Sequence, residues 1–181
     1  MKLITFNKIL LNIKMDELSQ YLKTGYYNEI ELQQILDKKI MITKNHVENI
    51  NLDYFNIHWY FDIITLFKKY GYIFTNDDYI LLVNKNKYII KIIPDDMKTD
   101  KLCKITVKSY GYLLQLVPED KKTYDLCKIA VRQDGQALLF VPKNKKTEEI
   151  CKIAMRQDKY ASNYVPDDIY KKLKWIISDK M

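Results

Sequence analysis

The chain of 181 residues is poor in glycine and proline, with four of each. Turn-rich β-sandwiches need both residues in many short loops, so this shortage disfavours an all-β fold. Histidine occurs only as His46 and His58, outside any metal-binding motif such as HExxH, and we expect neither to be a metal ligand. Glycine-rich phosphate loops and serine-hydrolase motifs are also missing. The sequence therefore predicts no catalytic residues, no metal site, no cofactor and no enzyme activity.

Long apolar runs are also missing from the sequence. No charge-free apolar stretch reaches the roughly 18 residues that a membrane-spanning helix needs. The apolar N-terminal run is interrupted by Asn7, Lys8 and Asn12, which is not typical of a signal peptide. We therefore expect a soluble intracellular protein, neither secreted nor membrane-bound. Its net charge of +7 is spread along the chain and predicts only weak attraction to anions.

The cysteines and the prolines recur in one register of 24 residues. They are Cys103, Cys127 and Cys151, and Pro94, Pro118, Pro142 and Pro166. The register defines units 94–117, 118–141 and 142–165, with an upstream unit 70–93 that lacks the proline and the cysteine. Because two residue types mark the same period independently, the sequence indicates a tandem repeat.

Each unit carries the signals of two short helices. Thr99, Thr123 and Thr147 are candidate N-caps of a first helix with helically spaced apolar residues. Gly111 and Gly135 would then allow a sharp turn into a short second helix. The next proline would end that helix, because the residue before a proline is pushed out of the α region. Such pairs bury their apolar faces only by stacking, so we expect an all-α solenoid of short helix pairs.

The predicted solenoid covers residues 62–181, and residues 1–61 form a helical N-terminal region or cap. In that region Asn28 followed by Glu31 has the pattern of a capping box. Residues 166–181 are expected to form a C-terminal capping helix whose outer face is polar. Its apolar face would consist of Ile169, Leu173, Ile176 and Ile177.

The stretch "AVRQDGQALLFV" carries a family resemblance. It resembles the unit "A-V-x-x-[ND]-G-x-A-L-x-[YF]-[AV]" of a tandem helical-repeat family of unknown function that is abundant in mimivirus-type giant viruses of amoebae. The matching residues are Ala130, Val131, Asp134, Gly135, Ala137, Leu138, Phe140 and Val141. The neighbouring units depart from it at Lys159 and at Thr106, Tyr110 and Leu113. The resemblance covers about residues 70–165 and implies a repeat fold, and for a viral protein the host cytoplasm, but no activity.

The repeated cysteines raise the question of a reactive or metal-binding cluster. Zinc sites use close pairs such as CxxC, whereas these cysteines lie 24 residues apart. Equivalent positions in stacked helices are separated by about 10 Å, beyond the reach of about 7 Å between the Cα atoms of a disulfide. We therefore interpret Cys103, Cys127 and Cys151 as small buried apolar side chains.

The first helices also repeat a basic pair at positions i and i+4. The six residues are Lys104, Lys108, Lys128, Arg132, Lys152 and Arg156. Aligned in two columns, they are candidates for contact with an anion or an acidic partner. The alternative is a solvated face, because Asp100 and Glu148 lie four residues before Lys104 and Lys152 and would pair with them.

Tyrosines are the remaining candidates, because tyrosine favours interfaces. The candidate interface residues are Tyr110, Tyr112, Tyr124, Tyr160 and Tyr164. We expect a non-enzymatic scaffold whose partner is an unidentified protein. The alternative is nucleic-acid binding through the Lys/Arg columns. The oligomeric state and the identity of the partner stay open at this stage.

Overall fold

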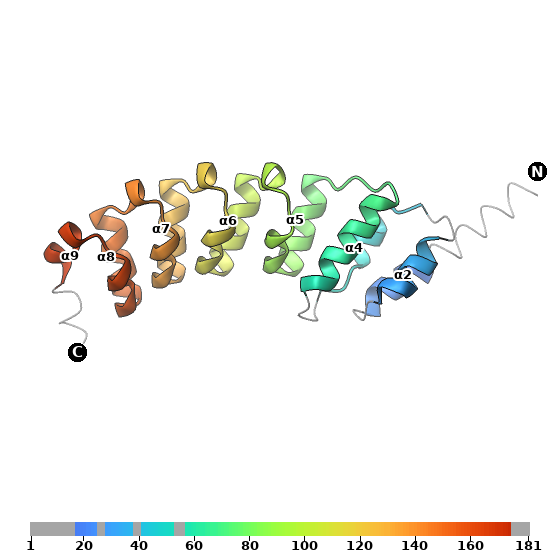
Figure 1. Cartoon of the computed structure of the whole chain (residues 1–181), viewed down its shortest axis with the longest axis horizontal. Helices are drawn as coiled ribbons and strands as arrows, with labels where there is room; N and C mark the ends of the chain where they lie inside the picture. The colour runs from blue at the N-terminus through green and yellow to red at the C-terminus, as the bar shows by residue number, and fades with distance from the viewer. Residues whose placement is uncertain (1–16, 25–27, 38–40, 53–56, 175–181) are drawn as a thin grey trace, which may run out of the picture. The chain divides into compact units, whose positions relative to one another are not determined.

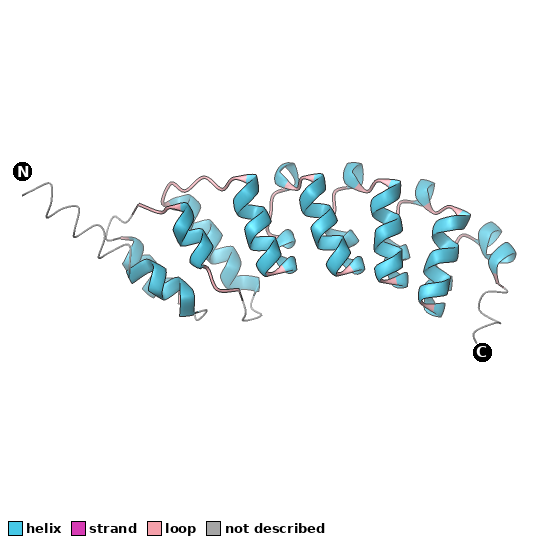
Figure 2. Ribbon diagram, turned by 180° about the vertical axis from the view of Figure 1, so that it is seen from behind, coloured by secondary structure: helices cyan, strands magenta, loops and turns pink. Residues whose placement is uncertain are grey.

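The computed structural model describes residues 17–24, 28–37, 41–52 and 57–174 (Figure 1). These residues form helices and connecting loops, and no strand occurs among them (Figure 2). The predicted all-α class is thereby confirmed for the described chain. Contacts divide the chain into two compact parts, the first part Met1–Ile89 and the second part Ile90–Met181. No helix in the described ranges is long and apolar enough to cross a membrane.

The first part contains a helix over residues 17–24 and four further helices. These are α2 (Glu29–Leu36), α3 (Lys44–Asn49), α4 (Ile57–Lys69) and α5 (Asn76–Lys85). Helix α2 packs against α4, and α3 packs against α5. Leu22, Leu36, Val47 and Phe67 are completely buried in this part. The expected helical character of residues 1–61 is confirmed where this region is described, and residues 1–16 lie outside the description.

Asn28 caps α2, as its position predicts. Its Oδ1 accepts hydrogen bonds from the backbone N–H of Ile30 at 2.9 Å and of Glu31 at 3.4 Å. The reciprocal half of the expected capping box is different. The Asn28 N–H donates to the hydroxyl of Tyr21 at 2.6 Å, so a tyrosine of the preceding helix takes the place predicted for the Glu31 carboxylate.

The second part, Ile90–Met181, repeats one pattern of elements (Figure 1). Its first helices are α6 (Asp100–Ser109), α7 (Tyr124–Gln133) and α8 (Glu148–Gln157). The second helices are η3 (Gly111–Leu116), η5 (Gly135–Phe140) and η7 (Lys159–Tyr164). Single 3-10 turns precede the first helices as η2 (Asp95–Met97), η4 (Glu119–Lys121) and η6 (Lys143–Lys145), and α9 (Asp167–Leu173) follows η7. Consecutive first helices pack on each other, and so do consecutive second helices.

The predicted caps explain where the first helices begin. The hydroxyls of Thr99, Thr123 and Thr147 accept hydrogen bonds from backbone N–H groups three residues later, at 3.4, 3.2 and 3.3 Å. An accepted bond of this kind satisfies an amide that the first helical turn leaves without a partner. The three N-cap predictions are confirmed.

The second helices differ from the expected α-helices because all three are 3-10 helices. A segment of six residues can form few i to i+4 bonds, and the tighter i to i+3 pattern is common in such short pieces. The prolines end them as predicted: Val117, Val141 and Val165, each before a proline, have extended backbones with ψ near 130°.

The two repeat glycines have a different reason from the predicted sharp turn. Gly71 is the positive-φ glycine of the described chain, so neither Gly111 nor Gly135 has a left-handed backbone. Instead, a Cβ atom on Gly111 would lie 2.3 Å from the carbonyl oxygen of Ala130, and one on Gly135 would lie 2.6 Å from that of Ala154. Glycine is therefore required because the next first helix passes too close for a side chain.

One apolar core runs through the second part of the chain. The fully buried Cys103, Cys127 and Cys151 belong to it, which confirms their interpretation as small apolar side chains. Leu173 of α9 is buried in the same core, and Ile169 packs against it. The other two residues of the predicted capping face, Ile176 and Ile177, lie outside the described residues. This core positions the outer surfaces of α6, α7 and α8.

Candidate functional site: the outer surface of the first helices

The basic residues of the first helices α6, α7 and α8 lie on the outer surface of the second part of the chain. Lys104, Lys108, Arg132 and Arg156 are exposed, whereas Lys128 and Lys152 are half-buried. Cys, Ala and Val positions of the same helices point into the core, so the 3.6-residue period separates the two faces. The structure thus places the six predicted residues on helix surfaces.

The predicted i,i+4 ion pairs are replaced by pairs to other segments. The Asp100 carboxylate lies 3.6 Å from the ammonium of Lys121 in the following link, instead of pairing with Lys104. Glu148 lies 3.9 Å from Lys172 of α9. Both first-turn carboxylates therefore pair with a lysine of the next unit. The spacing of residues on a single helix does not reveal such partners.

A compact polar cluster connects α7 and α8. The Lys128 ammonium lies 2.5 Å from the Glu149 carboxylate, and the Tyr124 hydroxyl donates to the same carboxylate at 2.5 Å. The Lys128 Nζ lies 6.0 Å from the centroid of the Tyr124 ring, within cation–π distance. Hydrogen bonds from Lys128 and Tyr124 lower the pKa of Glu149. We call this arrangement the Tyr124 cluster.

The predicted interface tyrosines fall into two groups. Tyr110 and Tyr160 are exposed to 43% and 60% of their surface, as an interface residue requires. Tyr112, Tyr124 and Tyr164 are half-buried. Tyr124 and Tyr164 pack against the core, which is the packing alternative to a partner contact. The rings of Tyr110 and Tyr112 lie 6.2 Å apart, so these two form a local aromatic pair.

The cysteines have the chemistry of buried thiols. Burial raises the pKa of Cys103, Cys127 and Cys151 to about 11. The Cys103 and Cys127 sulfurs face the backbone carbonyls of Lys98 at 3.8 Å and of Lys122 at 3.7 Å. A thiol that is buried and protonated at neutral pH is a poor nucleophile. Within the described ranges, no three His, Cys, Asp or Glu side chains form a group that could hold a metal ion.

The histidine with a described side chain, His46, has a structural role. It is fully buried in α3, and its Nδ1 accepts a hydrogen bond from the backbone N–H of Thr43 at 2.9 Å. Together they form a capping box at the start of α3. The side chain of His58 lies outside the described residues.

Sequence reasoning missed a glutamine that links neighbouring units. The Gln157 side chain accepts from the N–H of Gly135 at 2.7 Å and donates to the carbonyl of Gln133 at 3.4 Å. Gln133 makes the same pair of bonds with Gly111 and Ser109. A glutamine therefore bridges the break between the first and second helix of the preceding unit. The signal in the sequence is that each glutamine follows a repeat glycine by 22 residues.

Buried lysines were missed as well. Lys98 and Lys122, one residue before the capping threonines, are only 6% and 5% exposed. Lys98 donates to the Leu116 carbonyl at 3.0 Å, and Lys146 donates to the Tyr164 carbonyl at 3.1 Å, which ties each link to the end of its own second helix. Burial lowers the pKa of Lys146. These lysines count toward the net charge, but their hydrogen bonds stabilise the fold and they do not belong to the basic outer surface.

The fold and this surface define the class of the protein: an all-helical protein whose consecutive helices pack in regularly spaced units. A family model described as a domain of unknown function (DUF4116) matches residues 125–170, from α7 into α9. The matched segment is less than half of the chain and includes Cys127, Cys151, Gly135, Gln133 and Gln157. No curated protein and no solved structure matches the chain.

Proposed function

We propose that the repeated units form an α-solenoid and that this solenoid is a non-enzymatic scaffold that binds another protein. The observation that carries the proposal is the contrast between constant buried positions and variable exposed positions. The buried cysteine position is the same in three units, whereas the exposed position of Gln115 holds Leu139 and then Asn163. A stack that keeps its core and varies its surface presents a different contact in each unit, which suits recognition of an extended partner.

Exposed apolar side chains on the second helices support this proposal. Leu139 in η5 is 49% exposed, and Tyr160 in η7 is 60% exposed. Tyr110, directly before η3, is 43% exposed. Consecutive second helices pack side by side, so these residues lie on neighbouring elements. Aromatic and large apolar residues of this kind contribute most of the free energy of binding in many protein interfaces.

The test is capture of a defined partner by the full chain. We expect the immobilised chain to retain one protein whose direct binding is then reproduced with purified components. A variant with Tyr110, Leu139 and Tyr160 changed to Ser should lose that binding. Its matched control changes Gln115 and Asn163, exposed polar residues of the same second helices, to Ser and should bind normally. Equal binding by both variants, or no direct partner, would contradict the proposal.

The matched family segment suggests the extent of the array. We infer that the match at residues 125–170 marks the most regular part of a tandem array over about residues 70–165, of the kind seen in the viral repeat family that the sequence resembles. The support is that α6 and η3 follow the same 24-residue register upstream of the match.

The second candidate function is nucleic-acid binding through the Lys/Arg columns. Exposure of Lys108, Arg132 and Arg156 in the last turns of three adjacent first helices favours it. Changing Lys128, Arg132, Lys152 and Arg156 to Ala should then lower both the affinity for a duplex oligonucleotide and its dependence on salt. A control that changes Lys171 and Lys172 of α9 keeps the same outer columns. Unchanged binding in the four-residue variant would contradict this function.

A further inference from the structure

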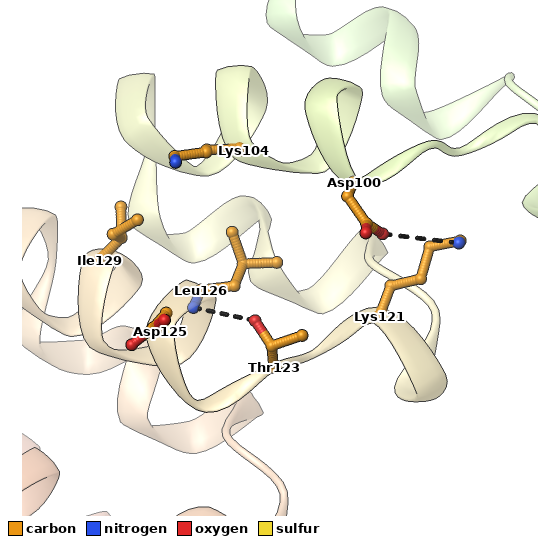
Figure 3. A pocket seen from close by; sticks show the side chains of 7 residues that line it. All are labelled: Asp100, Lys104, Lys121, Thr123, Asp125, Leu126 and Ile129. Atoms are coloured by element: carbon orange, nitrogen blue, oxygen red, sulfur yellow. Dashed lines mark hydrogen bonds and ion pairs between the residues drawn. The ribbon is translucent and has the colours of Figure 1, made fainter.

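A hollow lies between the first turns of α6 and α7 (Figure 3). Its volume is about 210 Å³. Asp100 and Lys104 of α6, Lys121 and Thr123 of the link, and Asp125, Leu126 and Ile129 of α7 line it. The hollow is smaller than the roughly 300–1,000 Å³ of pockets that enclose whole small-molecule ligands. Its size is therefore suited to one side chain.

The equivalent place one unit later is filled by the chain itself. Moving the lining residues by 24 positions leads to the Tyr124 cluster: Tyr124 stands where Asp100 does, Lys128 where Lys104 does, and Glu149 where Asp125 does. There the Tyr124 ring packs against the core beside Lys128, and its hydroxyl donates to Glu149 at 2.5 Å. The apolar lining is conserved between the two places, since Ile129 becomes Ile153.

The hollow between α6 and α7 has a lysine and a carboxylate at the matching positions, Lys104 and Asp125, but it lacks the phenol ring. Asp100 is too short to take the place of Tyr124, and its carboxylate faces Lys121 at 3.6 Å (Figure 3). The consequence is visible in the core beneath. Leu126 is 7% exposed at the base of the hollow, whereas its counterpart Ile150 next to the Tyr124 cluster is fully buried. Lys104 is exposed, whereas its counterpart Lys128 is half-buried.

We propose that the hollow between α6 and α7 receives one tyrosine side chain of the partner protein, in the place that Tyr124 occupies in the next unit. The partner's ring would lie over Leu126 and Ile129 with the Lys104 ammonium beside its face, and its hydroxyl would donate to the Asp125 carboxylate. This inference rests on the proposed scaffold function and names the chemical group that the scaffold recognises.

The charges that line the hollow balance, because Lys104 and Lys121 oppose Asp100 and Asp125; a neutral phenol keeps this balance and an acidic group does not. Asp100 and Asp125 already place two carboxylates at its edge, and Asp100 already has Lys121 as its partner. An additional carboxylate or phosphate would be repelled by Asp125. A phenol hydroxyl satisfies that carboxylate as a donor, and the ring face attracts Lys104. A phenylalanine would gain the ring contact and lose the hydrogen bond.

The hollow can be tested directly with N-acetyl-tyrosinamide as a probe in a 15N-edited NMR titration of the full chain. We expect shifts confined to the amides of the lining residues, above all Lys104, Asp125 and Ile129. N-acetyl-phenylalaninamide should bind about tenfold more weakly, because it lacks a hydrogen bond to a charged group. No shifts at the hollow, or equal binding of both probes, would overturn the inference.

Two substitutions at one register position provide matched controls. Asp100→Tyr supplies the ring in cis, so it should abolish the probe-induced shifts at the hollow. Tyr124→Asp removes the ring from the Tyr124 cluster, so a second set of shifts should arise at Lys128, Glu149 and Ile153. If the hollow still bound the probe in Asp100→Tyr, or Tyr124→Asp opened no second site, the assignment to a tyrosine place would be wrong.

Binding of the purified partner separates this inference from the scaffold function. Loss of partner binding in Asp100→Tyr, with the overall NMR spectrum retained, supports the tyrosine place. Full partner binding by Asp100→Tyr overturns it and leaves the scaffold function standing, because a partner is still bound. Absence of a direct partner for the unmodified chain contradicts the scaffold function itself, whatever the probe shows.

Discussion

At the scale of single residues, glycine and glutamine form matched pairs across the repeat. Gln157 hydrogen-bonds Gly135, and Gln133 hydrogen-bonds Gly111. The glycine lets the next first helix approach, and the glutamine on that helix satisfies the amide that the close approach would otherwise isolate from water. In the register one unit earlier, Lys87 stands at the glycine position and Ser109 at the glutamine position. The two residue types are therefore present or replaced together.

Replacing Gly111 with Ala tests this close approach. The new Cβ atom would lie 2.3 Å from the Ala130 carbonyl oxygen, so the helices must separate, and we expect a loss of about 1–3 kcal/mol in the free energy of unfolding. The matched control is Lys159→Ala at the same register position, where the residue is exposed. It should change stability by about 0.5 kcal/mol or less. Urea unfolding measures both, and equal stabilities would contradict the packing argument.

The buried cysteines predict how stability depends on pH. Their pKa is raised from 9.0 to about 11 in the folded protein because burial disfavours the thiolate. The unfolded chain therefore releases these protons first as the pH rises. The cysteine contribution to stability is complete below about pH 9 and is lost as the pH rises through about 11.

Urea midpoints measured at several pH values check this direction. We expect the midpoint to fall between pH 9 and 11, and to fall less steeply in Cys127→Ala, which has one buried thiol fewer. Tyrosine and lysine titrations are common to both proteins, so the difference between the two curves isolates the cysteine. Parallel curves would show that the Cys127 thiol titrates normally in the folded state.

At the scale of the elements, the sequence predicted helix starts better than helix types. A capping threonine acts through its own hydroxyl and the amides next to it, so Thr99, Thr123 and Thr147 could be identified from local pattern alone. The extended residue before each proline is equally local. The 3-10 form of η5 depends on its short length and on the packing of α8 against it, which single-sequence periodicity does not contain.

Thr123→Ala tests the contribution of a cap. Its hydroxyl accepts from the Leu126 N–H at 3.2 Å, and without it we expect α7 and the unit to lose about 1 kcal/mol of stability. Thr123→Ser keeps the acceptor oxygen and serves as the control, with stability close to that of the original chain. Chemical denaturation quantifies the difference. A Ser variant as unstable as the Ala variant would mean that the threonine methyl group, not the cap, matters.

The candidate site was predictable only in part, for a related reason. Helical spacing placed the Lys/Arg columns on the outer face, because that needs only the 3.6-residue period. It chose the wrong partners for two carboxylates, since Asp100 pairs with Lys121 and Glu148 with Lys172, in other elements. The hollow beside Asp100 depends on a difference between two units. The aligned sequence contains that difference, but its consequence appears only when the helices are packed.

At the scale of the whole molecule, the division into Met1–Ile89 and Ile90–Met181 predicts that the second part folds on its own. Its buried cluster extends from Cys103 to Leu173 and lies entirely within this part. Stacked units derive stability from their nearest neighbours, so each unit that is removed takes away one interface. The contribution of one interface can therefore be measured by shortening the fragment by one unit.

We expect a fragment of residues 90–181 to show a helical circular-dichroism spectrum and a cooperative thermal transition. A fragment of residues 118–181 lacks α6 and η3, so it exposes apolar surface of α7 that α6 buries, and it should unfold at a lower temperature. The fragment of residues 90–181 with the substitution Cys103→Ser keeps α6 and changes one buried side chain. Its stability should therefore lie between those of the two fragments. Two fragments with the same midpoint would mean that α6 adds no stabilising interface, and the nearest-neighbour description of this part of the chain would then fail.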